Sequence, residues 1–143
     1  MARETSKRAP SAKAAGKTSL HLRIDFGGTR SIGPGKIRLL ELILETGSIS
    51  AAGRALAMSY RQAWLLVDEL NHMFREPVVI AQTGGGGGGG TVVTETGHDI
   101  VRLYRGMERH ACGASTAERS ALTRLLAPPG RKSARQARPT STR

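Results

Sequence analysis

Residues 48–59 read Ser-Ile-Ser-Ala-Ala-Gly-Arg-Ala-Leu-Ala-Met-Ser and predict a helix-turn-helix. Serine hydroxyls suit helix N-caps because they accept hydrogen bonds from the first free amides, so Ser48 or Ser50 is expected to begin one short helix and Ser59 the next. The small side chains between them permit two helices to cross closely at a steep angle. Leu56 is expected to fill the space beneath the turn.

The sequence on either side predicts a winged helix-turn-helix domain, a mainly α-helical fold with a small β wing. Apolar and polar residues alternate over 20–26, which is the period of a strand, and two glycines end it. Helical apolar spacing and β-branched residues give the remaining elements, which are helices over 36–46, 48–56, 60–74 and 95–111 and strands over 78–82 and 91–93.

The apolar stripe of each expected helix identifies the residues that should face the core. These residues are Ile37, Leu40, Ile43 and Leu44 on the first helix, Ala63, Val67, Leu70 and Phe74 on the recognition helix, and Ile100, Val101, Tyr104 and Met107 on the last helix. A weaker helical pattern over 113–127 allows a short extra helix beyond the domain.

Positive charge is concentrated at the two ends of the 143-residue chain, whose net charge is +11. Residues 1–19 carry five basic residues and one acidic residue, 113–143 carry seven and one, and 20–112 carry ten and nine. We expect one domain over 20–112 between a disordered basic tail and a second, largely disordered basic tail. The basic ends indicate nucleic acid or an anionic membrane surface as a partner, and simple solvation of the tails is the alternative.

The composition argues against several other classes of protein. No run of 18 apolar residues exists, and no apolar stretch follows Met1, so neither a transmembrane helix nor a secretory signal is expected. The single cysteine, Cys112, has no internal disulfide partner, which fits a reducing compartment. The histidines lack metal-ligand spacing and no nucleophile–base motif occurs, so we expect no metal, no cofactor and no catalysis.

The exposed start of the recognition helix is the candidate DNA-reading surface. Ser59 would leave the N-terminal amides facing outward, where the helix dipole favours phosphate. Arg61 can pair with guanine and Gln62 with adenine, whereas Ser59 and Tyr60 are better placed for phosphate. Leu65 lies on the next turn and completes this set.

Arg54 and the predicted wing extend the surface. Arg54 is expected either to reach phosphate or to remain solvated. The wing residues expected to follow the DNA backbone are Thr83, Gly84, Gly85, Gly86 and Gly87. The glycine run leads into a strand and lacks the lysine of a Walker-type loop, which argues against nucleotide binding. A passive loop is the alternative, and Trp64 is expected to pack rather than to stack on DNA.

The strand over 20–26 and the last helix are candidate dimer contacts. A strand with an open edge can pair with a second copy of the chain. The residues expected to take part are Leu20, Leu22, Ile24, Tyr104 and Met107. Packing of both elements on their own core is the alternative.

Short motifs across the domain carry a family resemblance. They are Gly47-Ser-Ile-Ser50, Met58-Ser-Tyr-Arg-Gln-Ala-Trp64, Glu69-Leu-Asn71, Thr83 with the glycine run, and Val92-Val-Thr94 through Gly97 to Leu103-Tyr104. With these motifs, residues 20–111 resemble the N-terminal DNA-binding domain of the molybdate-responsive ModE regulators, within the wider LysR-type helix-turn-helix group. The resemblance implies a link to molybdenum and dimerisation through this domain, with the last helix taking part.

The chain also departs from the family pattern. Residues 113–143 show no strand pattern, so we do not expect the C-terminal molybdate-binding part of full-length ModE regulators, and no molybdate ligand is assigned. The run 84–90 holds no lysine, which the family's wing often contains. Wing contact is therefore expected to rely on backbone amides.

These features predict a cytoplasmic, sequence-specific transcriptional regulator that binds double-stranded DNA as a homodimer on an inverted repeat, without a membrane partner. Any signal would come from a separate molybdate-binding protein or from a full-length regulator. Two alternatives stay open. One is a nonspecific, nucleoid-type DNA-binding protein, and the other is a dimerisation partner that titrates a full-length regulator.

Overall fold

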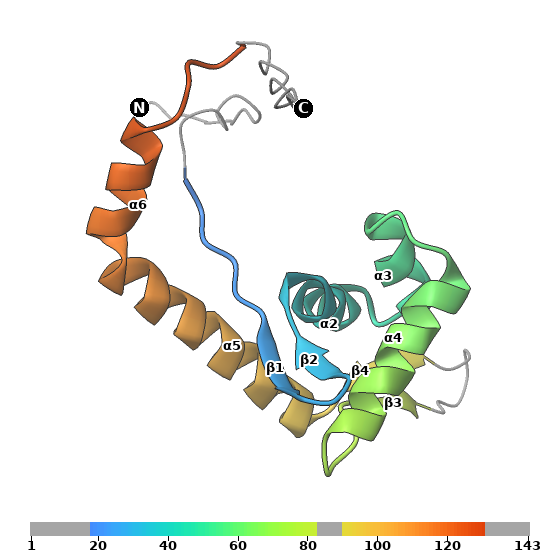
Figure 1. The fold of residues 1–143 in the computed structure, drawn as a ribbon. Helices are drawn as coiled ribbons and strands as arrows, with labels where there is room; N and C mark the ends of the chain where they lie inside the picture. Colours follow the sequence, from blue (N-terminus) through green and yellow to red (C-terminus); the bar gives the residue numbers. More distant parts are fainter. Residues whose placement is uncertain (1–17, 83–89, 131–143) are drawn as a thin grey trace, which may run out of the picture. The chain divides into compact units, whose positions relative to one another are not determined.

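The structure, a computed structural model, describes residues 18–82 and 90–130 and divides the chain into two units (Figure 1). Leu20–Gly113 form one unit, and Met1–Ser19 together with Ala114–Arg143 form the other. The first unit contains a helix-turn-helix, two β-hairpins and a long helix. The predicted winged helix-turn-helix fold is therefore confirmed.

Helix α2 (Pro34–Thr46) is the first helix of the domain and begins two residues earlier than predicted. Proline suits the first turn because the N–H it lacks would have no partner there. At the other end, Gly47 adopts a left-handed conformation (φ 69°), and its N–H donates to the Ile43 carbonyl at 2.7 Å. A glycine is favoured at this position because a side chain would strain such a backbone.

Serine caps begin both helices of the helix-turn-helix. Helix α3 (Ile49–Ala55) follows Ser48, whose hydroxyl accepts the N–H three residues later at 3.0 Å, so the first of the two candidate serines is the cap. Helix α4 (Tyr60–Met73) follows Ser59, whose hydroxyl accepts the Gln62 N–H at 3.0 Å. Both helices start where the caps predict.

The turn between α3 and α4 requires small residues and an unusual backbone. A Cβ at Gly53 would lie 3.0 Å from the Cβ of Ala63, so a larger residue at position 53 would push the helices apart. Ala57 adopts a left-handed conformation (φ 59°), and the Met58 N–H donates to the Gly53 carbonyl at 2.9 Å. Leu56 packs half-buried against the core beneath this turn, as predicted.

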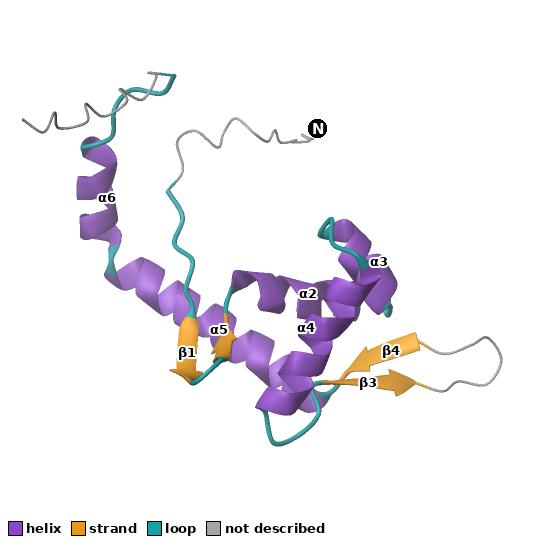
Figure 2. Cartoon of the chain, turned by 45° about the vertical axis from the view of Figure 1, so that its right-hand side comes forward, coloured by secondary structure: helices purple, strands orange, loops and turns teal. Residues whose placement is uncertain are grey.

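The wing consists of the antiparallel strands β3 (Val79–Gln82) and β4 (Gly90–Val93), which Figure 2 shows as a hairpin beside α4. Val79 pairs with Val93, and the described part of the ladder runs as far as the pair of Gln82 and Gly90. The β-branched residues of both strands predict this hairpin to within one residue at each described end.

A second hairpin precedes α2 and corrects the prediction. Strand β1 (Ile24–Gly27) pairs antiparallel with β2 (Arg30–Ile32), which the sequence pattern does not predict. Two left-handed glycines, Gly27 (φ 102°) and Gly28 (φ 64°), form its turn. The first strand is shorter than predicted because its pairing with β2 begins at Ile24 and Ile32, and the chain after Ile32 turns into α2.

Helix α5 (Glu95–Ala114) completes the domain and packs closely against the wing. Thr94, the residue before it, acts as its N-terminal cap, and its hydroxyl accepts the Gly97 N–H at 3.1 Å. A Cβ at Gly97 would lie 2.4 Å from Cγ1 of Val93 and 2.7 Å from the Val78 carbonyl oxygen, so only glycine fits there. The buried apolar side chains of the domain are Ile32, Ile37, Leu39, Leu40, Leu42, Ile43, Ala52, Ala63, Val67, Leu70, Val78, Val79, Val93, Ile100 and Tyr104.

Four residues that were predicted to face the core lie at its margin. Leu44 and Met107 are exposed, and Phe74 and Val101 are half-buried. Phe74 instead makes an edge-to-face contact with Phe26, with ring centroids 6.2 Å apart. Helical periodicity predicts which face of a helix turns inward, but it does not predict where the opposing element ends.

The second unit contains helix α6 (Thr116–Arg124), which confirms the extra helix allowed by the weak pattern over 113–127. None of its residues is buried, and Leu122, Leu125 and Leu126 are exposed. Within the described part of the chain, no helix combines the length and apolar character that a membrane span requires.

Candidate nucleic-acid interface

The outer face of α4 carries the residues predicted to read DNA. Successive residues turn by about 100° around a helix, so Arg61 and Leu65 lie nearly opposite the buried Ala63 and Leu70. The predicted contacts Ser59, Tyr60, Arg61, Gln62 and Leu65 are all exposed. This part of the candidate site is therefore free to meet a partner.

The N-terminal end of α4 suits an anion. Its first turn contains no acidic residue, so no side chain there neutralises the partial positive charge of the helix dipole. Arg54 of α3 is also exposed, and its Nη1 donates to the Ser50 hydroxyl at 3.0 Å. A guanidinium has five N–H donors, which leaves Arg54 able to bind phosphate.

Trp64 lies less buried than its predicted packing role suggests, with 45% of its surface exposed. On one side it borders a shallow hollow with Tyr60, Arg61 and Leu65. On the other side it borders a groove between α4 and the wing, together with Ile80. The indole therefore separates the outer face of α4 from the base of the wing.

Asn71, near the end of α4, holds the wing against the recognition helix. Its Oδ1 accepts the N–H groups of Val78 at 2.7 Å and Val79 at 3.0 Å, and its Nδ2 donates to the Val79 carbonyl at 2.9 Å. Three bonds from one side chain thus set where β3 begins relative to α4. Sequence reasoning found Asn71 only within a family motif and gave it no role, because helical periodicity does not relate it to its partners.

The second wing strand is also held by hydrogen bonds to neighbouring elements. The Thr91 N–H donates to the carbonyl of Gly47 at the end of α2, at 3.0 Å. The Thr94 hydroxyl donates to the Pro77 carbonyl at 2.7 Å, and the Thr94 N–H donates to the Val78 carbonyl at 2.9 Å. The wing residues predicted to contact DNA lie outside the described part of the chain; these are Thr83, Gly84, Gly85, Gly86 and Gly87.

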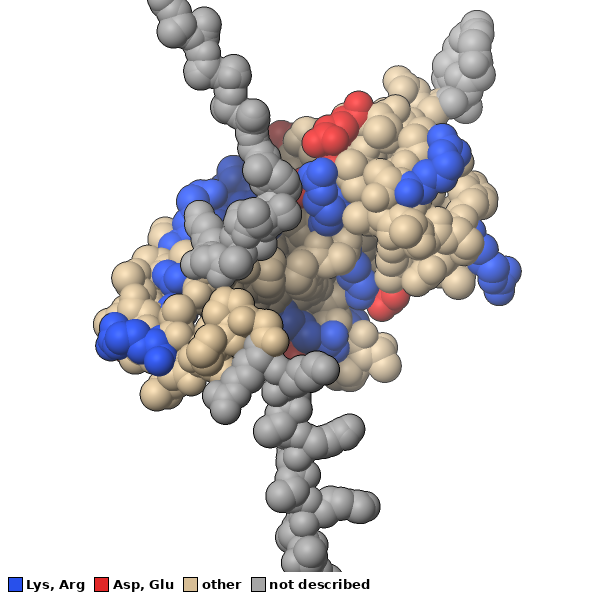
Figure 3. Space-filling view, turned by 90° about the horizontal axis from the view of Figure 1, so that it is seen from above, with Lys and Arg blue, Asp and Glu red and all other residues tan. Residues whose placement is uncertain are grey.

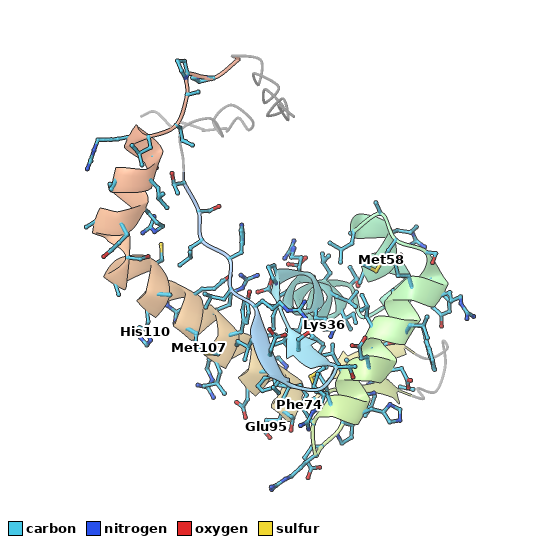
Figure 4. All side chains as sticks on the ribbon, viewed as in Figure 1. Lys36, Met58, Phe74, Glu95, Met107 and His110 are labelled. Carbon is cyan, nitrogen blue, oxygen red and sulfur yellow. The ribbon has the colours of Figure 1, made fainter. Side chains whose placement is uncertain are left out.

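Lys36, a residue of α2 that Figure 4 labels, connects its helix to β2 and to α4. Its Nζ donates to the Ser31 carbonyl of β2 at 2.7 Å and to Oε2 of Glu69 on α4 at 3.0 Å. The Glu69 carboxylate therefore forms an ion pair with Lys36. Nearby on α4, Nδ1 of His72 lies 3.5 Å from Oδ1 of Asp68. Among residues 18–82 and 90–130, no three His, Cys, Asp or Glu side chains are grouped as metal ligands.

An ion-pair cluster joins α2 to α5. Arg105 donates to both carboxylate oxygens of Glu41 at 2.9 Å and to Oε1 of Glu108 at 2.6 Å. The hydrogen bond from Arg105 holds the pKa of Glu41 below its ordinary value, against the opposing effect of burial. The bonds to Glu41 in turn raise the pKa of Arg105. The cluster fixes α5 on the helix that precedes the helix-turn-helix.

The predicted dimer contacts divide into buried and accessible residues. Tyr104 is fully buried, and its hydroxyl donates to the Leu22 carbonyl at 2.7 Å, which corrects its assignment to a dimer surface. It packs within its own domain, and burial raises the pKa of its hydroxyl. Leu20, Leu22 and Ile24 are half-buried, whereas Met107 remains 41% exposed (Figure 4).

An apolar cavity of about 280 Å³ opens between the β1–β2 hairpin and α5. Ile24 and Phe26 line it from β1, Phe74 from the end of α4, and Leu103 and Met107 from α5. Phe26, Leu103 and Met107 are exposed. Of the predicted dimer contacts that are not fully buried, Ile24 and Met107 line this apolar cavity.

Lys and Arg lie in separate groups, with uncharged surface between them, on the face that Figure 3 presents. This agrees with the near balance of basic and acidic residues over 20–112. On this face, separate basic side chains rather than one broad basic patch are available to meet a polyanion.

Comparisons with known proteins agree with the predicted resemblance. Over 73 residues the chain is 44% identical to the molybdenum transport protein ModE of Azotobacter vinelandii, covering 51% of this chain and 27% of that protein. It is 36% identical over 80 residues to the molybdenum-pterin-binding protein MopA of Rhodobacter capsulatus, covering 56% and 30%. It is 32% identical over 92 residues to the transcriptional regulator ModE of Haemophilus influenzae, covering 64% and 36%.

These similarities confirm the resemblance to ModE-type proteins, and the chain spans about a third of the length of the curated relatives it matches. No protein-family model matches the chain. The crystal structure of a LysR family transcriptional regulator matches with a TM-score of 0.48 and 18% identity, covering 65% of this chain and 30% of that one.

Proposed function

We propose that this chain is a DNA-binding transcriptional regulator of the ModE type, with α4 as its recognition helix. The observation that carries the proposal is the outer face of α4, where Arg61 and Gln62 are exposed behind a serine-capped, acid-free N-terminus. Similarity to regulators named ModE supports the same function. The function is binding, and it involves neither a catalytic step nor a cofactor.

Recognition follows from the order of side chains on the first turns of α4. The Arg61 guanidinium can donate two hydrogen bonds to O6 and N7 of a guanine, and the Gln62 amide can pair with N6 and N7 of an adenine. Ser59, Tyr60 and Arg54 contact the phosphates that flank the groove. Phosphate contacts set the position of the helix, and the two base contacts select the sequence.

The wing supplies backbone contacts next to the recognition helix. Asn71 fixes β3 against α4, so the wing and the recognition helix meet the duplex in one geometry. In this proposal Thr83 and Gly84 to Gly87 contact phosphates through backbone amides. Such contacts add affinity without adding sequence preference.

We infer a homodimer on an inverted repeat, with the two recognition helices in successive major grooves. The exposed apolar residues Phe26, Leu103 and Met107 support this inference because they surround a cavity at the end of the predicted dimer contact. The names of the relatives point to molybdenum as the signal. We propose that the signal reaches this regulator in the cytoplasm through a separate molybdate-binding protein or a full-length regulator.

Two observations favour second candidates. Ten of the eleven net positive charges fall on 1–19 and 113–143, which suits a nonspecific, nucleoid-type DNA-binding protein. The apolar surface near Met107 suits a dimerisation partner that titrates a full-length regulator. The first candidate predicts DNA affinity that ignores Arg61, and the second predicts tight mixed dimers with weak DNA binding.

Affinity selection of fragmented genomic DNA tests the proposal, with the full chain at about 150 mM salt to suppress loose electrostatic binding. Wild type, Arg61→Ala and Arg109→Ala are compared. Arg109 is the matched control because it is an exposed arginine on α5, so its removal changes the charge equally.

Wild type and Arg109→Ala should enrich one inverted repeat, and Arg61→Ala should lose or blur it. Enrichment without any motif in all three proteins would favour the nonspecific candidate. Weak enrichment in all three proteins would favour the titrating candidate.

A further inference from the structure

We propose that Leu65 reads the C5 methyl group of a thymine beside the guanine bound by Arg61. The inference rests on the proposed function, in which α4 occupies the major groove. It adds a determinant of sequence preference that acts through an apolar contact rather than a hydrogen bond. It also assigns a role to an exposed leucine on the outer face of α4.

Leu65 lies on the side of α4 that is turned away from the core. The buried stripe of α4 centres on Ala63, Val67 and Leu70, and a step of about 100° per residue places Leu65 on the opposite side. Its side chain is 47% exposed. The fold therefore gains little from a leucine at this position.

A single exposed leucine is ordinary on a protein surface, but Leu65 is not alone. Tyr60 and Trp64 are large, exposed and apolar in part, and with Arg61 they surround one shallow hollow on α4. Three such side chains on the first turns of a helix form an apolar surface beside one cation. That surface matches a partner with small apolar groups next to hydrogen-bond acceptors.

The major-groove edge of a thymine next to a guanine has this chemistry. Thymine presents a methyl group there, and guanine presents the two acceptors O6 and N7. Arg61 and Leu65 are four residues apart, which is about 6 Å along the helix axis. Base pairs are stacked about 3.4 Å apart, so the two side chains reach neighbouring base pairs or pairs two steps apart.

The hollow also explains why the methyl contact falls to Leu65 rather than to its neighbours. Trp64 borders the groove toward the wing as well as the hollow, so it lies to the side of the outward direction. Tyr60 lies at the very start of the helix, where the flanking phosphates are expected. Leu65 is the apolar side chain on the outward line shared with Arg61.

The test uses the full chain and duplexes selected by wild type from a random pool at about 150 mM salt. In the enriched duplex, each thymidine is replaced in turn by deoxyuridine, which lacks only the C5 methyl group. The dissociation constant of each duplex is measured for wild type, Leu65→Ala and Leu122→Ala. Leu122 is the matched control because it is an exposed leucine on α6 that lines neither the hollow on α4 nor the cavity beside α5.

We expect one thymine per half-site whose replacement weakens the binding of wild type and of Leu122→Ala about fourfold, which is the factor for hiding one methyl group from water. Leu65→Ala should bind the unmodified duplex about fourfold more weakly and should respond no further to that replacement. Melting temperatures measured by circular dichroism establish that both variants fold. The dissociation constants of wild type for the deoxyuridine duplexes test the methyl contact even if a variant does not fold.

The possible results separate this inference from the proposed function. No enriched sequence would overturn the proposed function and this inference with it. An enriched sequence whose thymines all tolerate deoxyuridine, or whose methyl dependence persists in Leu65→Ala, would overturn the inference alone. A change in oligomeric state in Leu65→Ala with unchanged thymine dependence would assign the leucine to a protein contact and would also overturn it.

Discussion

The two hairpins of the domain have strands of three or four residues, yet they are held in different ways. An isolated two-stranded hairpin is marginally stable in water, so each must be stabilised by the helices. The β3–β4 hairpin is held largely by hydrogen bonds. Asn71 binds β3 with three of them, and Thr91 and Thr94 attach β4 and its end to neighbouring backbone carbonyls.

The β1–β2 hairpin is held mainly by apolar packing. Ile32 is buried, Ile24 packs half-buried against the core, and Phe26 meets Phe74 edge to face. Two hydrogen bonds from helices reach this region: the Tyr104 hydroxyl donates to the Leu22 carbonyl just before the hairpin, and Lys36 Nζ donates to the Ser31 carbonyl of β2. Apolar packing leaves part of this surface open around the cavity near α5.

The contrast between hydrogen bonds at the wing and apolar packing at the first hairpin shows how one small core supports two surfaces. Hydrogen bonds are directional, so they fix the angle of the wing relative to α4. Apolar contacts are not directional, so they hold the first hairpin on the core without defining a single orientation for its outer side. A surface that must match a rigid duplex benefits from attachment by hydrogen bonds. An apolar surface that meets a second copy of the chain needs only apolar packing.

The largest effect is expected from Asn71→Ala, which breaks the attachment of the wing. The backbone N–H groups of Val78, just before β3, and of Val79, its first residue, lose their acceptor. Each partly buried donor left unpaired costs about 1 kcal/mol or more, so we expect a loss of about 2 kcal/mol. DNA affinity should fall beyond what unfolding explains, because the wing no longer meets the duplex in a fixed geometry. Urea unfolding and titration of the selected duplex measure the two effects.

His72→Ala is the matched control for this change. His72 is the next residue on α4, its side chain is 77% exposed, and its removal should change stability by less than about 0.5 kcal/mol. Equal losses in Asn71→Ala and His72→Ala would remove the distinction between the two hairpins.

A smaller effect is expected from Tyr104→Phe, which removes a hydrogen bond from α5 to the segment just before the first hairpin. The ring stays in the core, and the lost hydroxyl bond to Leu22 should cost about 1 kcal/mol. The preference for the selected duplex should not change, because the wing and α4 keep their contacts. Thermal unfolding and duplex titration test this, with Tyr60→Phe as an exposed tyrosine for comparison of stability.

The smallest effect is expected from the cluster that touches neither hairpin. Arg105 lowers the folded-state pKa of Glu41, so the bond stabilises the fold above the ordinary glutamate value of about 4.3 and its contribution is lost as the pH falls through the lower folded value. Glu41→Gln should cost less than about 1 kcal/mol at neutral pH and should flatten the loss of stability between about pH 5 and pH 3. Urea unfolding across this range measures it, and an unchanged pH profile would contradict the assignment.

Much of the fold could be predicted from local sequence signals. The serine caps and the small residues at the helix crossing act over a few residues, and the structure uses them as predicted. Strand β2 was missed because Arg30–Ile32 is too short to show a period of two. Because β2 was not predicted, the sequence also could not show that β1 pairs only from Ile24 onward.

The candidate site divides in the same way. The exposed start of α4 could be predicted, because a cap and an apolar stripe together identify which side chains face outward. The roles of Asn71 and Tyr104 could not, because their partners lie in other elements and become neighbours only when the chain folds. Periodicity identified Tyr104 as inward-facing but could not decide whether its own core or a second copy would cover it.

The most direct test of the central claim is the ratio of dissociation constants for the selected duplex and a scrambled duplex of equal length, measured at about 150 mM salt. Wild type and Arg109→Ala should favour the selected duplex by about a thousandfold or more. Arg61→Ala should lower that ratio at least about tenfold, because one bidentate contact to guanine is lost. Equal ratios in Arg61→Ala and Arg109→Ala would contradict the claim that α4 reads the sequence.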